Sequence, residues 1–136
     1  MTLEIGFSVT HRRYVPYSHA HYGGNLVDGA YGLALFGDVA TDLAIHTDGD
    51  ESLLAGYREV EFLAPIQAGD VVEVTATLTR VGTRSRDLAF EASVLCRAAP
   101  ERGPSAATVL DPPILATKAV ATIVVPAKTE GDPAPS

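Results

Sequence analysis

The stretch that most constrains the fold is residues 26–45, which are mostly apolar on every side of a helical projection. A helix with that pattern has to be buried, because a surface helix keeps one polar face. The stretch still contains Gly29, Gly32 and Gly37, and each costs about 1 kcal/mol relative to alanine inside a helix. Three such glycines suggest that something packs very close to the helix backbone.

After this helix the apolar period changes to two. Residues 47–51 form a polar turn, and alternating apolar and polar residues then predict strands in series. The predicted strands cover residues 54–62, 72–79, 88–96 and 115–125, after an extended lead-in over residues 7–17. Residues 98–113 are rich in proline, alanine and glycine and are predicted to form a loop. Strands without intervening helices favour an antiparallel sheet.

The length of 136 residues fits one domain, which we place over residues 1–126. Residues 127–136 are polar, contain two prolines and are predicted to be a disordered tail. One helix against one sheet covers one face only. A helix that is apolar all round is best buried by a sheet that wraps it and by a second subunit. The sequence therefore predicts an α+β domain that dimerises.

The charge pattern excludes some partners. The net charge is −7 with no basic block, which argues against nucleic acid. No apolar run reaches the ~20 residues of a membrane span, and residues 1–13 lack a signal core, so we expect a cytoplasmic protein. Cys96 lies in an alternating strand pattern and is interpreted as a core residue rather than a nucleophile. No cluster has metal-ligand spacing, so no metal is expected.

A glycine-rich turn precedes the long helix and suggests chemistry. Helix starts carry unpaired backbone N–H groups and the positive end of a dipole. Such donors stabilise a carbonyl oxygen that gains negative charge in a reaction. We therefore predict that the backbone N–H groups near Gly24 and Asn25 polarise a substrate carbonyl.

Three sequence segments carry a resemblance to a known fold. Residues 61–70 resemble the second strand of the hot-dog fold and the turn that follows it. Residues 81–85 resemble the turn between the third and fourth strands of that fold, and residues 24–29 resemble the turn before its central helix. This fold is found in acyl-CoA thioesterases and dehydratases. The resemblance implies an antiparallel sheet wrapped around a long central helix.

The resemblance is sharper to one branch, the ammonia-lyases of β-aminoacyl-CoA thioesters, and it covers roughly residues 10–126. The segments that carry it are residues 20–30, 37–43, 48–50 and 111–115, while 12–21 look closer to the 3-aminobutyryl-CoA enzymes. It implies reversible conversion of 3-aminobutyryl-CoA to crotonyl-CoA, or next of β-alanyl-CoA to acryloyl-CoA. Coenzyme A is then part of the substrate, and no separate cofactor is expected.

The resemblance also implies self-association as a dimer or a multiple of dimers. Active sites would lie between one subunit's helix start and the partner's helix. In thioesterase relatives the helical acid falls where this chain has Phe36, and Asp38 comes two residues later. Two residues turn a helix by ~200°. Either the helix is locally shifted or Asp38 does a different job, which makes plain thioester hydrolysis less favoured.

Ammonia elimination needs a base for the α-proton, and the candidates are Asp38, Glu61 and His21. A carboxylate half-buried among the apolar neighbours of Asp38 would have a raised pKa, which suits a base near neutral pH. A second carboxylate could hold the ammonium. The alternatives stay open: Asp38 only caps the helix or bonds a neighbouring backbone group or Thr41, Glu61 is a surface or interface residue, and His21 only bonds its loop.

Binding candidates lie at two further places. Arg84 and Arg86, with Ser85 between them, follow the predicted third strand and could hold coenzyme A phosphates, since arginine donates two bonds at once. The alternative is a solvated turn. Tyr22 and Tyr57 could line the pantetheine or acyl channel, and core packing is the alternative for both.

Two other functions remain open from the sequence. One is an acyl-CoA thioesterase or enoyl-CoA hydratase on the same fold. The other is a non-catalytic module that binds acyl-CoA. Fold alone does not decide among them.

Overall fold

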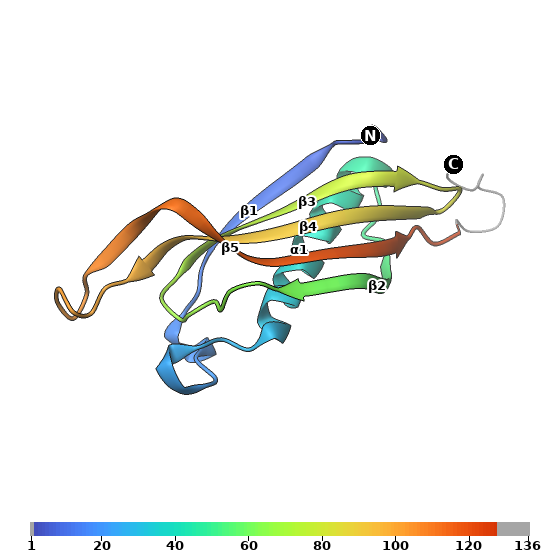
Figure 1. Ribbon diagram of the computed structural model, residues 1–136. Helices are drawn as coiled ribbons and strands as arrows, with labels where there is room; N and C mark the ends of the chain where they lie inside the picture. The colour runs from blue at the N-terminus through green and yellow to red at the C-terminus, as the bar shows by residue number, and fades with distance from the viewer. Residues whose placement is uncertain (1, 128–136) are drawn as a thin grey trace.

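The structure is a computed structural model that describes residues 2–127, and in it one long helix lies along a five-stranded antiparallel sheet (Figure 1). The elements are β1 (Ser8–Tyr14), two 3₁₀ turns (Tyr17–His19 and Gly23–Asn25), α1 (Gly29–Asp48), β2 (Leu53–Phe62), β3 (Val71–Val81), β4 (Ser85–Ala98) and β5 (Ala107–Val124). The strand order is β1-β3-β4-β5-β2, which leaves β1 and β2 at the edges. The predicted sheet around a central helix is confirmed.

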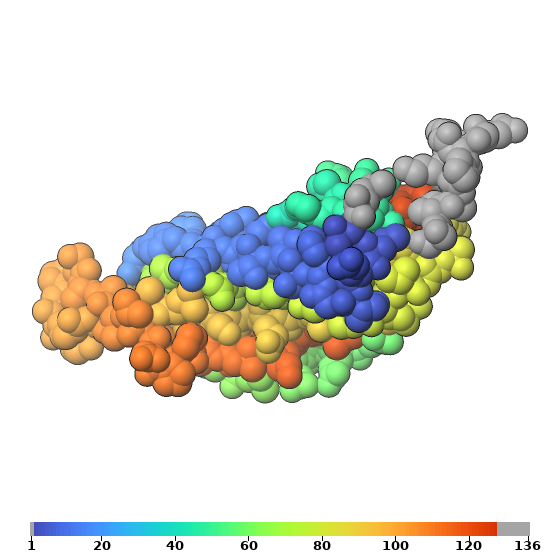
Figure 2. Space-filling model, turned by 90° about the horizontal axis from the view of Figure 1, so that it is seen from above, coloured from blue at the N-terminus to red at the C-terminus, as the bar shows by residue number. Residues whose placement is uncertain are grey.

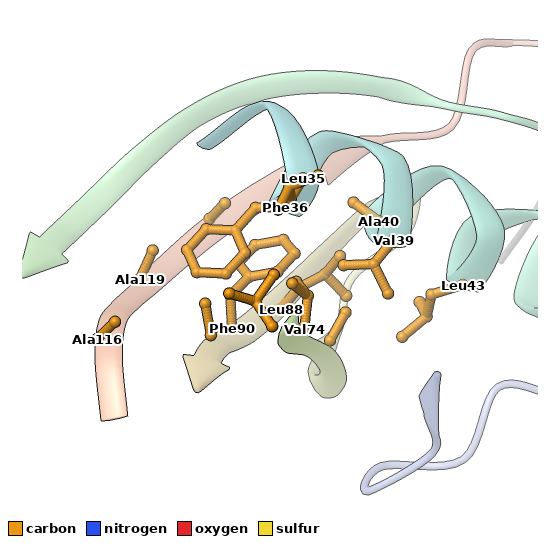
Figure 3. Packing of buried hydrophobic residues seen from close by; sticks show 14 of the residues in the cluster. Leu35, Phe36, Val39, Ala40, Leu43, Val74, Leu88, Phe90, Ala116 and Ala119 are labelled. Carbon is orange, nitrogen blue, oxygen red and sulfur yellow. The ribbon is translucent and has the colours of Figure 1, made fainter. Parts of the chain in front are cut away.

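The core lies between α1 and the inner face of the sheet (Figure 3). Strand β3 shows why: every second residue is buried, while the residues between them face the outer side. The four buried residues are Val72, Val74, Ala76 and Leu78. From the helix, Phe36 stacks on Phe90 of β4 with ring centroids 4.8 Å apart. Full burial of such side chains stabilises the fold by about 1.5–3 kcal/mol each.

The helix begins and ends three residues later than residues 26–45. Asp28 has extended backbone and caps the helix, because its carboxylate accepts a hydrogen bond from the Tyr31 N–H at 2.9 Å. Leu26 is held outside the helix by a bridge to Gln67. At the other end Gly49 adopts the left-handed conformation (φ 64°) that commonly follows a helix.

The prediction of a loop over residues 98–113 is wrong for the second half of that segment. Strand β5 already starts at Ala107, and the end of β4 and the start of β5 form a hairpin arm that projects from the body (Figures 1 and 2). Two of the four prolines that suggested a loop, Pro112 and Pro113, lie inside β5 where its pairing with β4 slips. A bulge tolerates proline because no ladder hydrogen bond is required there.

Cys96 lies beside the same slip in the β4–β5 pairing. Its side chain is half-buried, so the prediction that it belongs to the core is wrong. Of the predicted tail, residues 128–136 lie outside the described residues. No helix within residues 2–127 is long and apolar enough to cross a membrane. In that range no group of acidic, histidine or cysteine side chains could hold a metal ion.

The edge strand β1 is tied to α1 by polar contacts that the sequence did not indicate. His11 Nε2 lies 2.6 Å from Asp42 Oδ2. His46, one turn after Asp42, places Nδ1 2.8 Å from the Asp42 carbonyl oxygen. The His11 contact holds the edge of the sheet against the second half of the helix, while the His46 contact lies within the helix.

Candidate active site

A cavity of about 430 Å³ lies at the start of α1. Its walls come from the first turn of the helix, the end of β2 with the segment that follows, and one residue of β5. The lining residues are Val27, Asp28, Gly29, Gly32, Phe62, Leu63, Ala64, Pro65, Ile66 and Thr117. Most of this lining is apolar, with a few polar groups, which is the usual composition of a small-molecule site. We call it the α1 pocket.

The first backbone N–H groups of α1 are the polar donors of the α1 pocket. The N–H groups in the first turn of a helix have no carbonyl partner within the helix. The Asp28 carboxylate accepts a hydrogen bond from the Tyr31 N–H group. The N–H groups of Gly29 and Ala30 have no partner among residues 2–127. The helix dipole adds positive potential at the same place. Such a place suits an oxygen atom that gains negative charge during a reaction.

The predicted donors near Gly24 and Asn25 do not lie in the helix start. Both belong to the 3₁₀ turn before it, and Asn25 has a positive φ of 60°. The Asn25 carbonyl accepts a hydrogen bond from the Ala68 N–H at 2.8 Å. The turn thus joins the loop to the β2–β3 connection, and the helix-start donors move to Gly29 and Ala30.

Gly29 lies directly against the ring of Phe62. A Cβ atom at Gly29 would come 2.8 Å from Cε1 of the Phe62 ring, closer than real Cβ contacts allow. The ring therefore forms one wall of the α1 pocket directly beside the helix start. This explains one of the three glycines that suggested close packing.

Thr117 is the one residue of β5 in the α1 pocket, and the sequence did not mark it. It sits on the inner face, opposite Phe62 of β2 and Ala92 of β4 in the ladder, and is 3 % exposed. Its hydroxyl has no hydrogen-bond partner among the described residues. The only sequence signal was that a polar residue alternates with apolar ones in that strand.

Asp38 lies on the surface of α1 that faces away from the sheet. It is exposed, so the expected half-burial is wrong, whereas Phe36 two residues before it is fully buried. The Thr41 hydroxyl bonds the Gly37 carbonyl at 2.9 Å rather than Asp38. Nine residues separate Asp38 from Gly29, or about 14 Å along the helix axis. Asp38 therefore does not reach the α1 pocket of its own chain.

Glu61 lies on the outer face of the sheet. Its ladder partner there is Lys118, and both line a second cavity of about 440 Å³ on that face. Asp38 and Glu61 therefore lie on opposite sides of the sheet. A single chain does not bring these two carboxylates together, and a shared role for them stays a prediction that requires a second copy of the chain.

His21 and Tyr22 lie in the exposed loop before the helix. Their rings meet edge to face with centroids 4.6 Å apart, and the His21 backbone N–H donates to the Leu26 carbonyl. Neither lines the α1 pocket. Tyr57 is half-buried with its ring 6.3 Å from that of Phe90, and burial raises the pKa of its phenol. For Tyr57 the structure shows core packing.

Arg86 is not available to coenzyme A phosphates, which corrects that prediction. Strand alternation puts it on the inner face, where it is fully buried. Its Nε and Nη2 donate to Asp48 at 3.1 and 2.8 Å, and Nη1 donates to the Gly82 carbonyl at 2.8 Å. Arg84 is exposed and free of that constraint, while Ser85 Oγ accepts a hydrogen bond from Arg80 at 2.9 Å.

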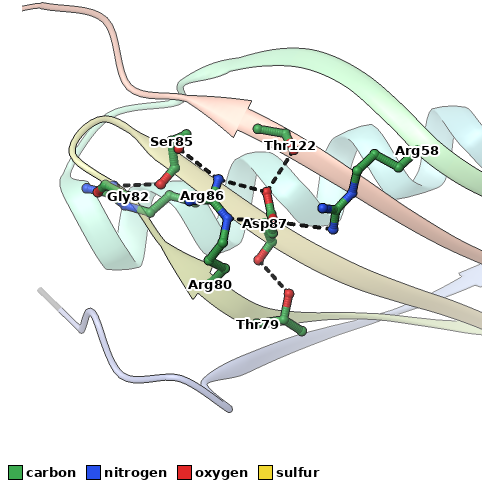
Figure 4. Close-up of polar contacts among 8 residues, drawn as sticks. All are labelled: Arg58, Thr79, Arg80, Gly82, Ser85, Arg86, Asp87 and Thr122. Carbon is green, nitrogen blue, oxygen red and sulfur yellow. Dashed lines mark hydrogen bonds and ion pairs between the residues drawn. The ribbon is translucent and has the colours of Figure 1, made fainter.

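A buried carboxylate next to this turn was missed from the sequence (Figure 4). Asp87 is 2 % exposed and accepts hydrogen bonds from Arg80 Nε at 2.7 Å and Thr122 Oγ1 at 2.7 Å. Arg58 adds an ion pair at 3.2 Å. The hydrogen bond from Arg80, more than any other contact, holds the pKa of Asp87 below its ordinary value. The network ties β2, β3, β4 and β5 together.

Comparison with known proteins places the chain in a family. Residues 23–93 match the family model described as the thioesterase superfamily. The 3-aminobutyryl-CoA ammonia lyase of Acetoanaerobium sticklandii is 50 % identical over 107 residues, which cover 79 % of this chain and 85 % of that protein.

Solved structures agree. The β-alanyl-CoA:ammonia lyase from Clostridium propionicum has a TM-score of 0.85 and 33 % identity, covering 98 % of this chain and 93 % of that one. A hexameric hot-dog fold thioesterase of Campylobacter jejuni has a TM-score of 0.71 and 16 % identity, and the match covers 93 % of this chain and 88 % of that one. At this identity the match shows the fold alone. The predicted resemblance is confirmed: the chain has the hot-dog fold and belongs, within the thioesterase superfamily, to the family of the 3-aminobutyryl-CoA and β-alanyl-CoA ammonia lyases.

Proposed function

We propose that this protein is a carbon–nitrogen lyase that reversibly eliminates ammonia from a short β-aminoacyl-CoA. The first substrate is 3-aminobutyryl-CoA, which gives crotonyl-CoA, and the second is β-alanyl-CoA, which gives acryloyl-CoA. The 50 % identity to a 3-aminobutyryl-CoA ammonia lyase, over most of both chains, carries this proposal. Coenzyme A enters as part of the substrate.

The α1 pocket suits the first step of this reaction. The thioester carbonyl oxygen accepts hydrogen bonds from the backbone N–H groups of Gly29 and Ala30, which makes the α-proton more acidic. A base removes that proton, and the electron pair of the C–H bond forms the new Cα–Cβ double bond. The C–N bond breaks with its electron pair on nitrogen, so the β-ammonium leaves as ammonia.

The base in this proposal is Asp38 of a second copy of the chain. Asp38 is exposed and too far along α1 to serve the pocket of its own chain. It shares one uncovered helix face with the exposed residues Ala30 and Ala34, which are small enough for another helix to approach. A second subunit on this face would bring its own Asp38 toward the α1 pocket.

Strand β2 supports the same association. It is an edge of the sheet, so it carries unpaired backbone groups that can pair with another chain. Large apolar side chains along and just after it are exposed: Leu53, Leu54, Phe62 and Leu63 are 48–64 % exposed in the single chain. Such a surface is typical of a protein–protein interface. We therefore propose a dimer, or a multiple of dimers, with the active sites at the subunit interface.

Arg84 remains the proposed contact for the coenzyme A phosphates. It is exposed in the β3–β4 turn, and its guanidinium can donate two hydrogen bonds to one phosphate. His21, Tyr22 and Glu61 lie outside the α1 pocket of this chain, and their predicted roles stay predictions that require a second copy.

The test follows the absorbance of the enoyl-thioester band of crotonyl-CoA with purified protein, with and without an ammonium salt. Loss that depends on ammonium is the expected result. Loss without ammonium would indicate hydration, or hydrolysis if a thiol reagent detects free coenzyme A. No loss, combined with retained binding of crotonyl-CoA, would indicate a non-catalytic binding module. Each of these last results overturns the proposal.

A further inference from the structure

Thr117 carries a polar group that the fold itself does not use. Buried hydroxyls in proteins are nearly always hydrogen-bonded. Thr117 is 3 % exposed, yet its hydroxyl has no partner within residues 2–127. In that range Ser52 Oγ is the one side-chain oxygen that is both unpaired and sealed from solvent. Thr117 Oγ1 is therefore unpaired but open to solvent, and the α1 pocket is the cavity that it lines.

The position of Thr117 relative to α1 defines how deep this hydroxyl lies. A Cβ atom built on Gly32 would be 3.8 Å from Thr117 Oγ1, so the hydroxyl faces the helix at Gly32. Gly32 is three residues beyond Gly29, or about 4.5 Å along the helix axis. The hydroxyl thus lies about one helical turn beyond the donors that would hold the thioester carbonyl.

We propose that Thr117 binds the nitrogen of the β-amino group, and this inference rests on the function proposed above. The nitrogen is attached two carbons beyond the carbonyl carbon, so a carbonyl held at Gly29 places it about one turn deeper, at Thr117. A threonine hydroxyl can accept an N–H bond from the ammonium and can also donate to the lone pair of free ammonia. The hydroxyl can therefore hold the nitrogen on both sides of the reaction.

Asp28 makes the charge of this subsite suitable. A cation near a helix start is disfavoured by the dipole. Asp28 lines the same pocket, and among residues 2–127 the Tyr31 N–H is the one donor to its carboxylate, at Oδ1. Its negative charge offsets both the ammonium and the helix start. Thr117 and Asp28 together would distinguish an aminoacyl thioester from an unsubstituted one.

The experiment compares Thr117→Val and Thr117→Ser in the full chain. Valine has the shape of threonine without the hydroxyl, and serine keeps the hydroxyl. Thr77→Val is the matched control, because Thr77 is a half-buried threonine of β3 on the outer face of the same sheet. For each protein, ammonium addition to crotonyl-CoA gives KM for ammonium, KM for crotonyl-CoA and kcat. Urea unfolding gives the stability.

The expected result for Thr117→Val is a KM for ammonium that is higher by about 10- to 100-fold, with little change in kcat. Its KM for crotonyl-CoA should change little, and its stability should be unchanged or higher, since an unpaired hydroxyl is removed. Thr117→Ser should restore most of the activity, and Thr77→Val should behave like the parent.

Three outcomes would overturn the inference. If Thr117→Val keeps the parent's ammonium dependence, the hydroxyl does not bind nitrogen. If kcat falls while KM for ammonium stays constant, the hydroxyl acts on the carbonyl instead. If the parent protein adds no ammonium to crotonyl-CoA, the proposed function fails, and the role of Thr117 fails with it. In the first two outcomes the proposed function stands.

Discussion

Arg86 and Asp48 form a buried ion pair between the first residues of β4 and the last turn of α1. Two guanidinium nitrogens meet the two carboxylate oxygens, at 3.1 and 2.8 Å, and both side chains are 3 % exposed or less. Thr47 Oγ1 donates a further bond to the same carboxylate at 2.8 Å. The pair fixes where the helix ends against the sheet.

Replacing Arg86 with Met should destabilise the protein by about 3–5 kcal/mol, because it leaves the Asp48 carboxylate buried without a counter-charge. Replacing both Arg86 and Asp48 with apolar residues should cost less than the single change. Arg84→Met, two residues away and exposed, is the control and should change stability by less than about 0.5 kcal/mol. Urea unfolding measures all of them. A neutral Arg86→Met would contradict the structural role of the pair.

This pair also shows where sequence reasoning stops. The strand periodicity of residues 88–96 was strong enough to place β4, and the apolar run of 26–45 was strong enough to place α1 to within three residues. Alternation extended to Arg86 would have put it on the inner face beside Leu88. A buried arginine is rare, however, and its partner is 38 residues away in the sequence.

The candidate site was predicted less well than the fold. The glycine-rich turn correctly indicated the helix start, but Asp28 takes the cap and moves the free N–H groups to Gly29. The sequence did not identify Thr117 as a site residue, because a threonine with an unpaired hydroxyl has the same alternating pattern as any other strand residue. The relation of Asp38 to the pocket depends on a second copy, and a pattern within one chain does not encode that distance.

Asp87 should make stability depend on pH in the acid range. Its pKa is lowered in the folded protein, first by the hydrogen bond from Arg80, relative to an ordinary value of 3.8. A lowered folded-state pKa contributes stability that is fully present above the ordinary value and is lost as the pH falls through the folded value. Asp87→Asn should therefore be less stable at neutral pH, with a difference that narrows below pH 3.8.

Unfolding by urea at neutral and at acid pH measures that narrowing. Glu91→Gln is the matched control, because Glu91 is exposed on the same face of β4. A difference between the parent and Asp87→Asn that stays constant with pH would show that the Arg80 contact contributes no charge-dependent stability.

Gly29→Ala should lower activity more than stability. The added Cβ would be 2.8 Å from the Phe62 ring, but Phe62 is 59 % exposed and its ring can turn away. Alanine also favours the helix. We expect a stability change within about 1 kcal/mol, and a loss of kcat/KM of about 10- to 100-fold because the pocket wall moves. Adding Phe62→Leu should recover activity, and failure to recover would show that the ring is not the obstacle.

Asp38→Asn and Glu61→Gln separate the two carboxylates that the sequence offered as bases. Both side chains are exposed in the chain, so neither change should alter stability by more than about 0.5 kcal/mol. Asp38→Asn should lower kcat by about 100-fold or more, since general base catalysis contributes that much. Glu61→Gln, on the outer face of the sheet, should keep most of the activity. The reverse pattern would move the base to Glu61 and reject the proposed subunit arrangement.

Asp28 is expected to have two separable roles. As the helix cap it accepts the Tyr31 N–H bond, and asparagine is about as good a cap as aspartate, whereas alanine costs about 1 kcal/mol. In the proposed amine subsite it supplies a negative charge, which a neutral side chain such as asparagine does not replace. Asp28→Asn should therefore keep its stability while KM for ammonium rises by about tenfold, and Asp28→Ala should lose both. Unfolding curves and ammonium titrations with crotonyl-CoA measure the two effects. If Asp28→Asn keeps the parent's KM for ammonium, the carboxylate acts only as a cap, and the positive charge of the substrate must be offset by another group.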